Sequence, residues 1–148
     1  MKKLLGPFCL TLIIFIGSVG VSESADFQKG LDALQKKDYA TALREWKPLA
    51  EKGHAPAQSG LGMMYFTGQG VSKDYKTAVK WFKLAAEQGH LLAQANLGWI
   101  HYKGIGVSQN HEIALKYHRL VLKNDGINKK QKDLVRDYIK NSERELKK

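Results

Sequence analysis

Residues 78–102, with the sequence AVKWFKLAAEQGHLLAQANLGWIHY, decide how the rest of the chain is interpreted. When the chain is shifted along itself by 36 residues, this stretch and the residues after it align without a gap with an earlier stretch. The pairs that coincide are Gly53-His54 with Gly89-His90, Ala57-Gln58 with Ala93-Gln94, Leu61-Gly62 with Leu97-Gly98, and Gly68, Gly70 and Val71 with Gly104, Gly106 and Val107. A fixed period of a few tens of residues is typical of stacked-repeat proteins. The sequence therefore predicts a repeat architecture.

Each copy has the pattern of two helices joined by a glycine-rich turn. In the first copy, an apolar stretch over residues 55–66 is followed by the turn TGQGVSKD and by an amphipathic stretch over residues 75–88. The turn glycines allow positive φ angles. Asp74 is expected to cap the second helix because its carboxylate can accept free N–H groups. Asn110 in the second copy and Asp38 before the first keep this chemistry.

Two glycines lie inside the first expected helix of the repeat. Gly60 and Gly62 would each weaken an isolated helix by up to about 1 kcal/mol relative to alanine. They are explained if another helix packs closely against them, so they predict a tight helix–helix contact rather than chemistry.

The register divides the chain into four segments after its N-terminus. Residues 26–53 align with the repeat but lack the Gly-x-Gly-Val turn, so we predict a degenerate first repeat or cap, in which Pro48 kinks the second helix or ends it early. Residues 54–88 and 89–124 are the two complete repeats. Residues 127–148 have a narrow apolar stripe in a charged helix, which is typical of a terminal capping helix.

The repeated elements A-x-A-Q-x-x-L-G-x-x-Y, G-x-G-V and D-x-x-x-A-x-x-W-x-x-x-A-A-x-x-G resemble the Sel-one-like repeat family, a branch of the tetratricopeptide-like α/α solenoids. In the first copy they are Ala55-Pro56-Ala57-Gln58, Leu61-Gly62, Tyr65, Gly68-Gln69-Gly70-Val71, Asp74, Ala78, Trp81, Ala85-Ala86 and Gly89. The second copy departs from the pattern at His101, Tyr117 and Val121-Leu122. The resemblance implies an all-α fold: a short right-handed superhelical solenoid of helix-turn-helix repeats with a C-terminal capping helix. It also implies an adaptor that holds protein partners, often in the bacterial envelope.

The N-terminus has the pattern of an export signal. A positive head is followed by an apolar run from about residue 4 to 19 and by small polar residues up to 25. Residues 1–25 are therefore predicted to be a signal peptide, with cleavage after Ser24 or Ala25, which places the protein in the periplasm or outside the cell. The alternative is an uncleaved anchor. Cys9 is the only cysteine, so the mature chain would contain no disulfide.

The chain is basic, with 24 Lys and Arg against 14 Asp and Glu and a net charge of +10. Such a charge favours anionic surfaces or acidic partners, but solvated helix faces are the preferred explanation for it. No basic run is interleaved with stacking aromatic residues, so a nucleic-acid partner is not expected.

The sequence contains no recognisable catalytic or metal-binding set. His54 and His90 follow helix-ending glycines at equivalent positions, so the register accounts for them. His111 and His118 are seven residues apart and are placed to share a helix face, but HEIAL is not the H-E-x-x-H zinc pattern. The Gly-x-Gly turns lack the Gly-Lys-Ser/Thr of a phosphate-binding loop. No enzyme activity, cofactor or metal is therefore expected.

The resemblance places the first helix of each repeat along the concave face, where a partner would bind. Gln58, Met63, Asn96 and Trp99 occupy positions on these helices that are expected to project into the groove. Trp99 is a candidate apolar anchor, because tryptophan often dominates interfaces, and Asn96 could hydrogen-bond a peptide backbone. For Trp99 the alternative is packing against the C-terminal helix.

The leading hypothesis is an exported, non-enzymatic module that binds a protein or peptide. One alternative is an electrostatic binder of anionic envelope polymers or membrane surfaces through the basic C-terminal helix. Another is a small envelope hydrolase, which no acid–base pair or nucleophile in the sequence supports.

Overall fold

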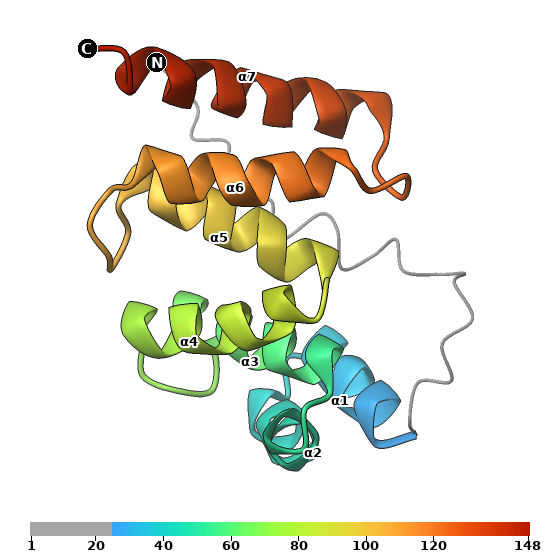
Figure 1. The fold of residues 1–148 in the computed structure, drawn as a ribbon. Helices are drawn as coiled ribbons and strands as arrows, with labels where there is room; N and C mark the ends of the chain where they lie inside the picture. Colours follow the sequence, from blue (N-terminus) through green and yellow to red (C-terminus); the bar gives the residue numbers. More distant parts are fainter. Residues whose placement is uncertain (1–24) are drawn as a thin grey trace.

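The computed structural model describes residues 25–148, and this part of the chain folds into helices without a strand (Figure 1). The helices are α1 (Ala25–Gln35), α2 (Tyr39–Glu51), α3 (Ala55–Thr67), α4 (Tyr75–Glu87), α5 (Leu91–Lys103), α6 (His111–Leu122) and α7 (Lys129–Glu145). The predicted signal peptide lies outside the described residues, apart from Ala25 at the start of α1. None of these helices combines the length and apolar character needed to cross a membrane.

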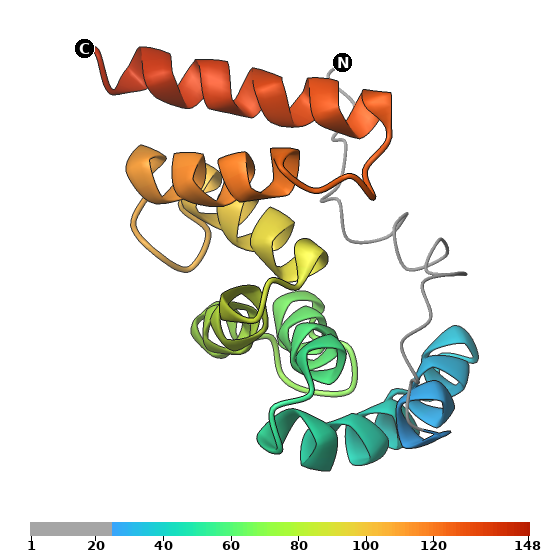
Figure 2. The same ribbon diagram turned by 45° about the vertical axis from the view of Figure 1, so that its right-hand side comes forward.

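The helices form a stack in which each packs chiefly on its neighbours in the chain. The pairs α1–α2, α3–α4 and α5–α6 follow one another, and α7 packs on α6 at the end (Figures 1 and 2). In Figure 2, α3 and α4 are seen nearly end-on while α7 lies across the view, so the direction of the helices turns along the stack. The predicted all-α solenoid of helix pairs is confirmed.

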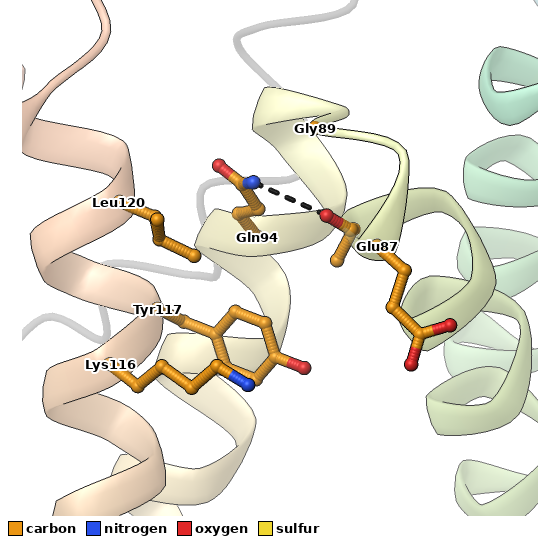
Figure 3. A pocket seen from close by; sticks show the side chains of 7 residues that line it. Glu87, Gly89, Gln94, Lys116, Tyr117 and Leu120 are labelled. Carbon is orange, nitrogen blue, oxygen red and sulfur yellow. Dashed lines mark hydrogen bonds between the residues drawn. The ribbon is translucent and has the colours of Figure 1, made fainter.

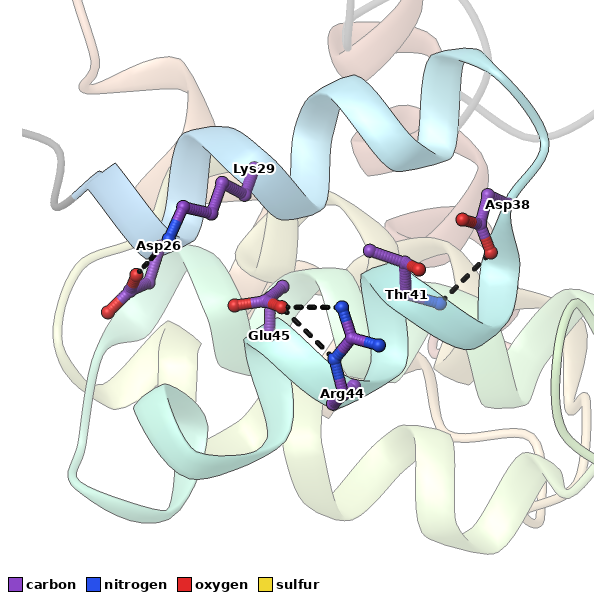
Figure 4. Close-up of polar contacts among 6 residues, drawn as sticks. All are labelled: Asp26, Lys29, Asp38, Thr41, Arg44 and Glu45. Atoms are coloured by element: carbon purple, nitrogen blue, oxygen red, sulfur yellow. Dashed lines mark hydrogen bonds and ion pairs between the residues drawn. The ribbon is translucent and has the colours of Figure 1, made fainter.

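The predicted caps fix where the second helix of each pair begins. Asp38 accepts a hydrogen bond from the Thr41 backbone N–H at 3.1 Å (Figure 4). The Asp74 carboxylate accepts from Thr77 and Lys76, and its hydrogen bonds with Thr77 lower the pKa of that carboxyl. The Asn110 side chain accepts from the Ile113 N–H at 2.9 Å. All three cap predictions are confirmed.

The prediction that Pro48 ends its helix early is wrong. Helix α2 continues through Pro48 to Glu51, and the Pro48 carbonyl still accepts a hydrogen bond from the Lys52 N–H at 3.3 Å. Proline removes one donor but leaves its own carbonyl available to the next turn. The buried Trp46 and Ala50 on either side of it hold that turn against the core.

The glycines inside the helices mark close contacts, as predicted. A Cβ atom built on Gly60 would lie 2.6 Å from the Trp46 ring, and one on Gly62 would lie 2.7 Å from the Phe82 ring. Neither distance leaves room for a methyl group. The helix-weakening effect of glycine is therefore offset by the approach of a large aromatic ring.

The last helix has its own apolar contact with the stack. Ile127 and Val135 form a small buried cluster with Val121 of α6. The N-terminus of α7 is fixed by a capping box in which Asn128 and Gln131 exchange hydrogen bonds. Beyond its buried stripe α7 is mostly charged and exposed, as expected of a helix that closes a stack.

Candidate binding site at the second repeat junction

Gln58 does not project into an open groove, so that prediction is wrong. Its side chain is buried, and its Nε2 donates to the Ala50 carbonyl at 3.0 Å. Its Oε1 accepts from Gln88 Nε2 at 2.8 Å. Gln94 repeats the first contact one repeat later, donating to the Ala86 carbonyl at 3.3 Å. The repeated glutamine therefore ties the first helix of one repeat to the end of the preceding one.

Asn96 is also buried, and the expectation that it lines an open groove is wrong as well. Helix α5 packs against both α4 and α6, so more of its circumference is covered than the single stripe of a surface helix. An asparagine on a helix packed on two sides is removed from solvent.

Met63 and Trp99 are half-buried and pack against the same apolar cluster. The Trp99 ring stands edge-on to Phe66, with 6.0 Å between ring centroids. Trp99 also lines a narrow crevice together with Val135 and Tyr138 of α7. The structure thus supports the packing alternative for Trp99, and a partner contact by Met63 or Trp99 stays a prediction.

A pocket of about 250 Å³ opens at the junction between the two complete repeats (Figure 3). It lies where the end of α4 meets α5 and the outer part of α6. The residues that line it are Ala86, Glu87, Gly89, Gln94, Lys116, Tyr117 and Leu120. Three helices therefore contribute to one concave site that combines apolar, charged and amide groups.

The polar groups of this pocket are of both kinds, donors and acceptors. Burial raises the pKa of the Tyr117 hydroxyl, and the nearby Glu87 carboxylate raises it further, so the phenol stays protonated as a donor. The Lys116 ammonium lies 5.4 Å from the centre of the Tyr117 ring. Gln94 is only 8% exposed, and no residue within 25–148 donates a hydrogen bond to its Oε1. The pocket thus offers an amide oxygen with spare capacity.

Sequence reasoning missed this pocket, although the signal was present. Tyr117 stands where the first complete repeat has Trp81, and Asn124 stands where it has Gln88. Both changes replace a larger side chain with a smaller one. In this chain, the two residues that depart from the repeat indicate the pocket better than the residues that recur.

One pair of side chains has the composition of a nucleophile and a base. His111 Nδ1 lies 3.3 Å from Ser142 Oγ. Ser142 is, however, 0% exposed, because α7 places it against α6. A substrate cannot reach that hydroxyl, so the pair joins two helices. In the described part of the chain no three His, Cys, Asp or Glu side chains are grouped to hold a metal.

Comparison with known proteins identifies the repeats. The family model described as Sel1 repeat matches residues 55–90 and 91–120. A protective antigen present in uropathogenic Escherichia coli strains, which displays an SLR fold, is 33% identical with a TM-score of 0.65. A Sel1 repeat protein from Oxalobacter formigenes is 32% identical with a TM-score of 0.63. A search of curated proteins finds no significant match.

The two solved structures are larger than this chain. Each alignment covers 68% of this chain, but only 22% of the Escherichia coli antigen and 40% of the Oxalobacter formigenes protein.

Proposed function

We propose that this chain, a member of the Sel1-like repeat family, is an exported adaptor that binds a protein or peptide partner and performs no catalysis. The observation that carries the proposal is the open pocket at the second repeat junction, where Gln94, Lys116 and Tyr117 present hydrogen-bonding groups beside Leu120. Residues that dominate protein interfaces are enriched in tyrosine and cluster in well-packed pockets.

The size of the pocket favours a macromolecular partner. Pockets for drug-sized ligands usually measure about 300–1,000 Å³, whereas this one measures about 250 Å³. It is large enough for one side chain of a partner, and the neighbouring helices supply the remaining contact surface. A partner anchored by one side chain fits this arrangement better than a free metabolite.

Export is supported by the N-terminal sequence pattern, a positive head followed by an apolar run and small residues. Expression of the full chain followed by cell fractionation and N-terminal sequencing tests it. A mature protein that begins near residue 25 in the periplasm or medium is expected. Recovery of the intact chain in the cytoplasm would contradict export.

Partner binding is tested with two matched variants. Lys116 is exposed at the pocket. Its exposed equivalent is Lys80 at the first junction, where the N-terminal helix pair meets the first complete repeat. There the larger Trp81 and Gln88 stand in place of Tyr117 and Asn124. The full chain with a C-terminal affinity tag is used to capture envelope proteins, which are identified by mass spectrometry. We expect a protein that is captured by the wild type and by Lys80→Glu, and lost with Lys116→Glu. Equal capture by both variants would argue against the pocket.

A second candidate function is binding to an anionic surface through α7. The segment 129–148 contains eight basic and four acidic residues. Arg136 and Lys148 pair with acidic neighbours. Lys129, Lys130 and Lys140 are exposed and form no ion pair with any described residue. Binding to vesicles that contain an anionic lipid should then fall steeply as salt rises from 50 to several hundred millimolar, because surface charges are screened over about 10 Å at 0.1 M.

A further inference from the structure

The first repeat junction carries a side chain that the second lacks. Gln88 follows the last turn of α4, and its Nε2 donates to Gln58 Oε1 at 2.8 Å and to the Leu84 carbonyl at 3.4 Å. Its carboxamide therefore lies between α3 and α4, the two helices of the first complete repeat. Gln58 has both ends of its amide engaged as a result.

At the second junction the residue equivalent to Gln88 is Asn124, and its side chain does not reach Gln94. Asn124 is shorter than Gln88, and its Oδ1 accepts a hydrogen bond from the Gly126 N–H at 2.8 Å within its own turn. Gln94, the equivalent of Gln58, still donates to Ala86, but no described residue donates to its Oε1. The pocket opens beside this side chain (Figure 3). The position that a carboxamide fills in the first junction is vacant in the second.

We propose that this pocket binds the side-chain carboxamide of a glutamine or asparagine carried by the protein partner. The proposal rests on the proposed function and names the chemistry of the group that enters the site. In the bound state the partner's amide N–H donates to Gln94 Oε1, as Gln88 donates to Gln58. The aliphatic part of that side chain lies against Leu120, the equivalent of Leu84.

The mixed character of the pocket favours a carboxamide over a charged group. A carboxylate has no hydrogen to donate to the Gln94 oxygen, and the Glu87 carboxylate in the same lining disfavours a second negative charge. An ammonium can donate to the Gln94 oxygen, but the Lys116 ammonium in the same lining disfavours a second positive charge. A carboxamide carries no charge and can donate to the Gln94 oxygen, and this pairing matters because a buried unpaired polar group is costly.

The first test is a nuclear magnetic resonance titration of the mature protein obtained from the full chain. The probe is N-acetylglutamine methylamide, compared with N-acetylglutamate methylamide and N-acetylnorleucine methylamide. We expect the glutamine probe to shift the Gln94 side-chain amide signals and those of Tyr117 and Leu120, with a dissociation constant on the order of 1 mM. The other two probes should bind at least about tenfold more weakly, the effect of one lost hydrogen bond. Equal shifts with all three probes, or shifts elsewhere only, would overturn the proposal.

The second test closes the pocket with the residues of the first junction. The double substitution Tyr117→Trp with Asn124→Gln should abolish the response to the glutamine probe, whereas Asn124→Ala should keep it. Thermal unfolding of the double variant shows whether it is folded. A folded double variant that binds the probe as the wild type does would contradict the proposal.

Partner capture separates this inference from the proposed function. If the double variant and Lys116→Glu both lose the partner while the glutamine probe titrates into the wild type, both statements hold. If a partner is captured through the pocket but no carboxamide probe binds there, the adaptor function stands and the carboxamide inference fails. If the probe binds and no partner is ever captured, the adaptor function fails.

Discussion

The three helix pairs α1–α2, α3–α4 and α5–α6 differ at one inward-facing position that recurs every 36 residues. We call the contacts of the ring at this position the first, second and third joint of the stack. Trp46 and Phe82 occupy it in the first two helix pairs, and His118 occupies it in the third. Each ring is almost fully buried and lies against a helical glycine, which is Gly62 for Phe82 and Gly98 for His118. The geometry of the joint is therefore retained while its chemistry changes from apolar to polar.

The histidine connects the third pair to the capping helix. Its ring stacks on Tyr138 of α7, with 5.2 Å between centroids and 18° between planes, and Tyr102 of α5 lies at 6.5 Å. His111, one heptad earlier, reaches Ser142 of α7, which confirms that the two histidines share a helix face. The Nδ1 atom of His118 has no hydrogen-bond partner within residues 25–148. Because an unsatisfied buried polar atom costs stability, the third joint is expected to be weaker than the second.

The largest expected effect follows from truncating the ring in the stronger joint. Phe82→Ala should lower the free energy of unfolding by about 3–5 kcal/mol, since it removes a fully buried ring and leaves a cavity beside Gly62. His118→Ala should cost less, because it also removes the unpaired nitrogen. Urea denaturation of both variants at pH 7 measures the difference. An equal or larger loss for His118→Ala would show that the histidine joint is not the weaker one.

Acid should weaken the third joint. Burial lowers the pKa of His118 from 6.5 to about 4, so the folded protein resists protonation of this ring while the unfolded chain accepts it. The unfolded state then binds more protons between pH 6.5 and 4, and stability is lost as the pH falls through that window, by about 3 kcal/mol in total from this group. Tyr102 and Tyr138 face the ring, and neither offers a carboxylate to hold the added charge.

The measurement is urea denaturation at a series of pH values between 7 and 4. His90, whose pKa burial and the nearby His54 also lower to about 4, adds a contribution of the same sign. His90→Gln is therefore the matched control. The His90→Gln variant should retain the fall in the free energy of unfolding that His118 causes at acid pH. A substitution of His118 should abolish that fall. A flat profile in the wild type would contradict the assignment.

A smaller effect is expected from replacing His118 with phenylalanine, the residue at the equivalent position 82. His118→Phe should raise the free energy of unfolding at pH 7 by roughly 1 kcal/mol, because it removes the unsatisfied nitrogen and keeps a ring of similar size against Gly98. It should also reduce the acid loss. Amide hydrogen exchange in α7 reports whether the gain is local, with slower exchange expected in the variant. Loss of stability would mean that the histidine makes contacts that phenylalanine cannot replace.

Much of the fold could be predicted because the residues that determine each local feature occur in both copies of the repeat. The helix pairs, the caps at Asp74 and Asn110, and the close contact at Gly62 all follow from residues whose local chemistry is sufficient to place them. Pro48 was misinterpreted because a proline near the end of a helix removes a single donor, while burial of the residues around it decides whether the helix continues.

The candidate site was harder to predict, because it depends on how three helices meet. Gln58 was expected to face a groove because it lies on the first helix of a repeat. Instead, it and its register equivalent Gln94 both contact the end of the preceding helix. The pocket instead arises from the smaller Tyr117 and Asn124, and only the three-dimensional structure shows that Asn124 turns toward Gly126. Most of the lining residues recur in the register, and the two departures, Tyr117 and Asn124, account for the opening.

The smallest expected effect concerns the cap that begins α6, the helix that carries His118. Asn110→Ala should lower the free energy of unfolding by about 1 kcal/mol, because the Ile113 N–H loses its acceptor at the start of the helix. Asn110→Asp keeps an acceptor and places negative charge at a helix N-terminus, so it should be neutral or slightly stabilising at pH 7. If the third joint is the weak one, Asn110→Ala should speed hydrogen exchange in α6 and α7 and leave α2 and α3 unchanged. A uniform acceleration across all helices would show instead that the stack unfolds as one unit.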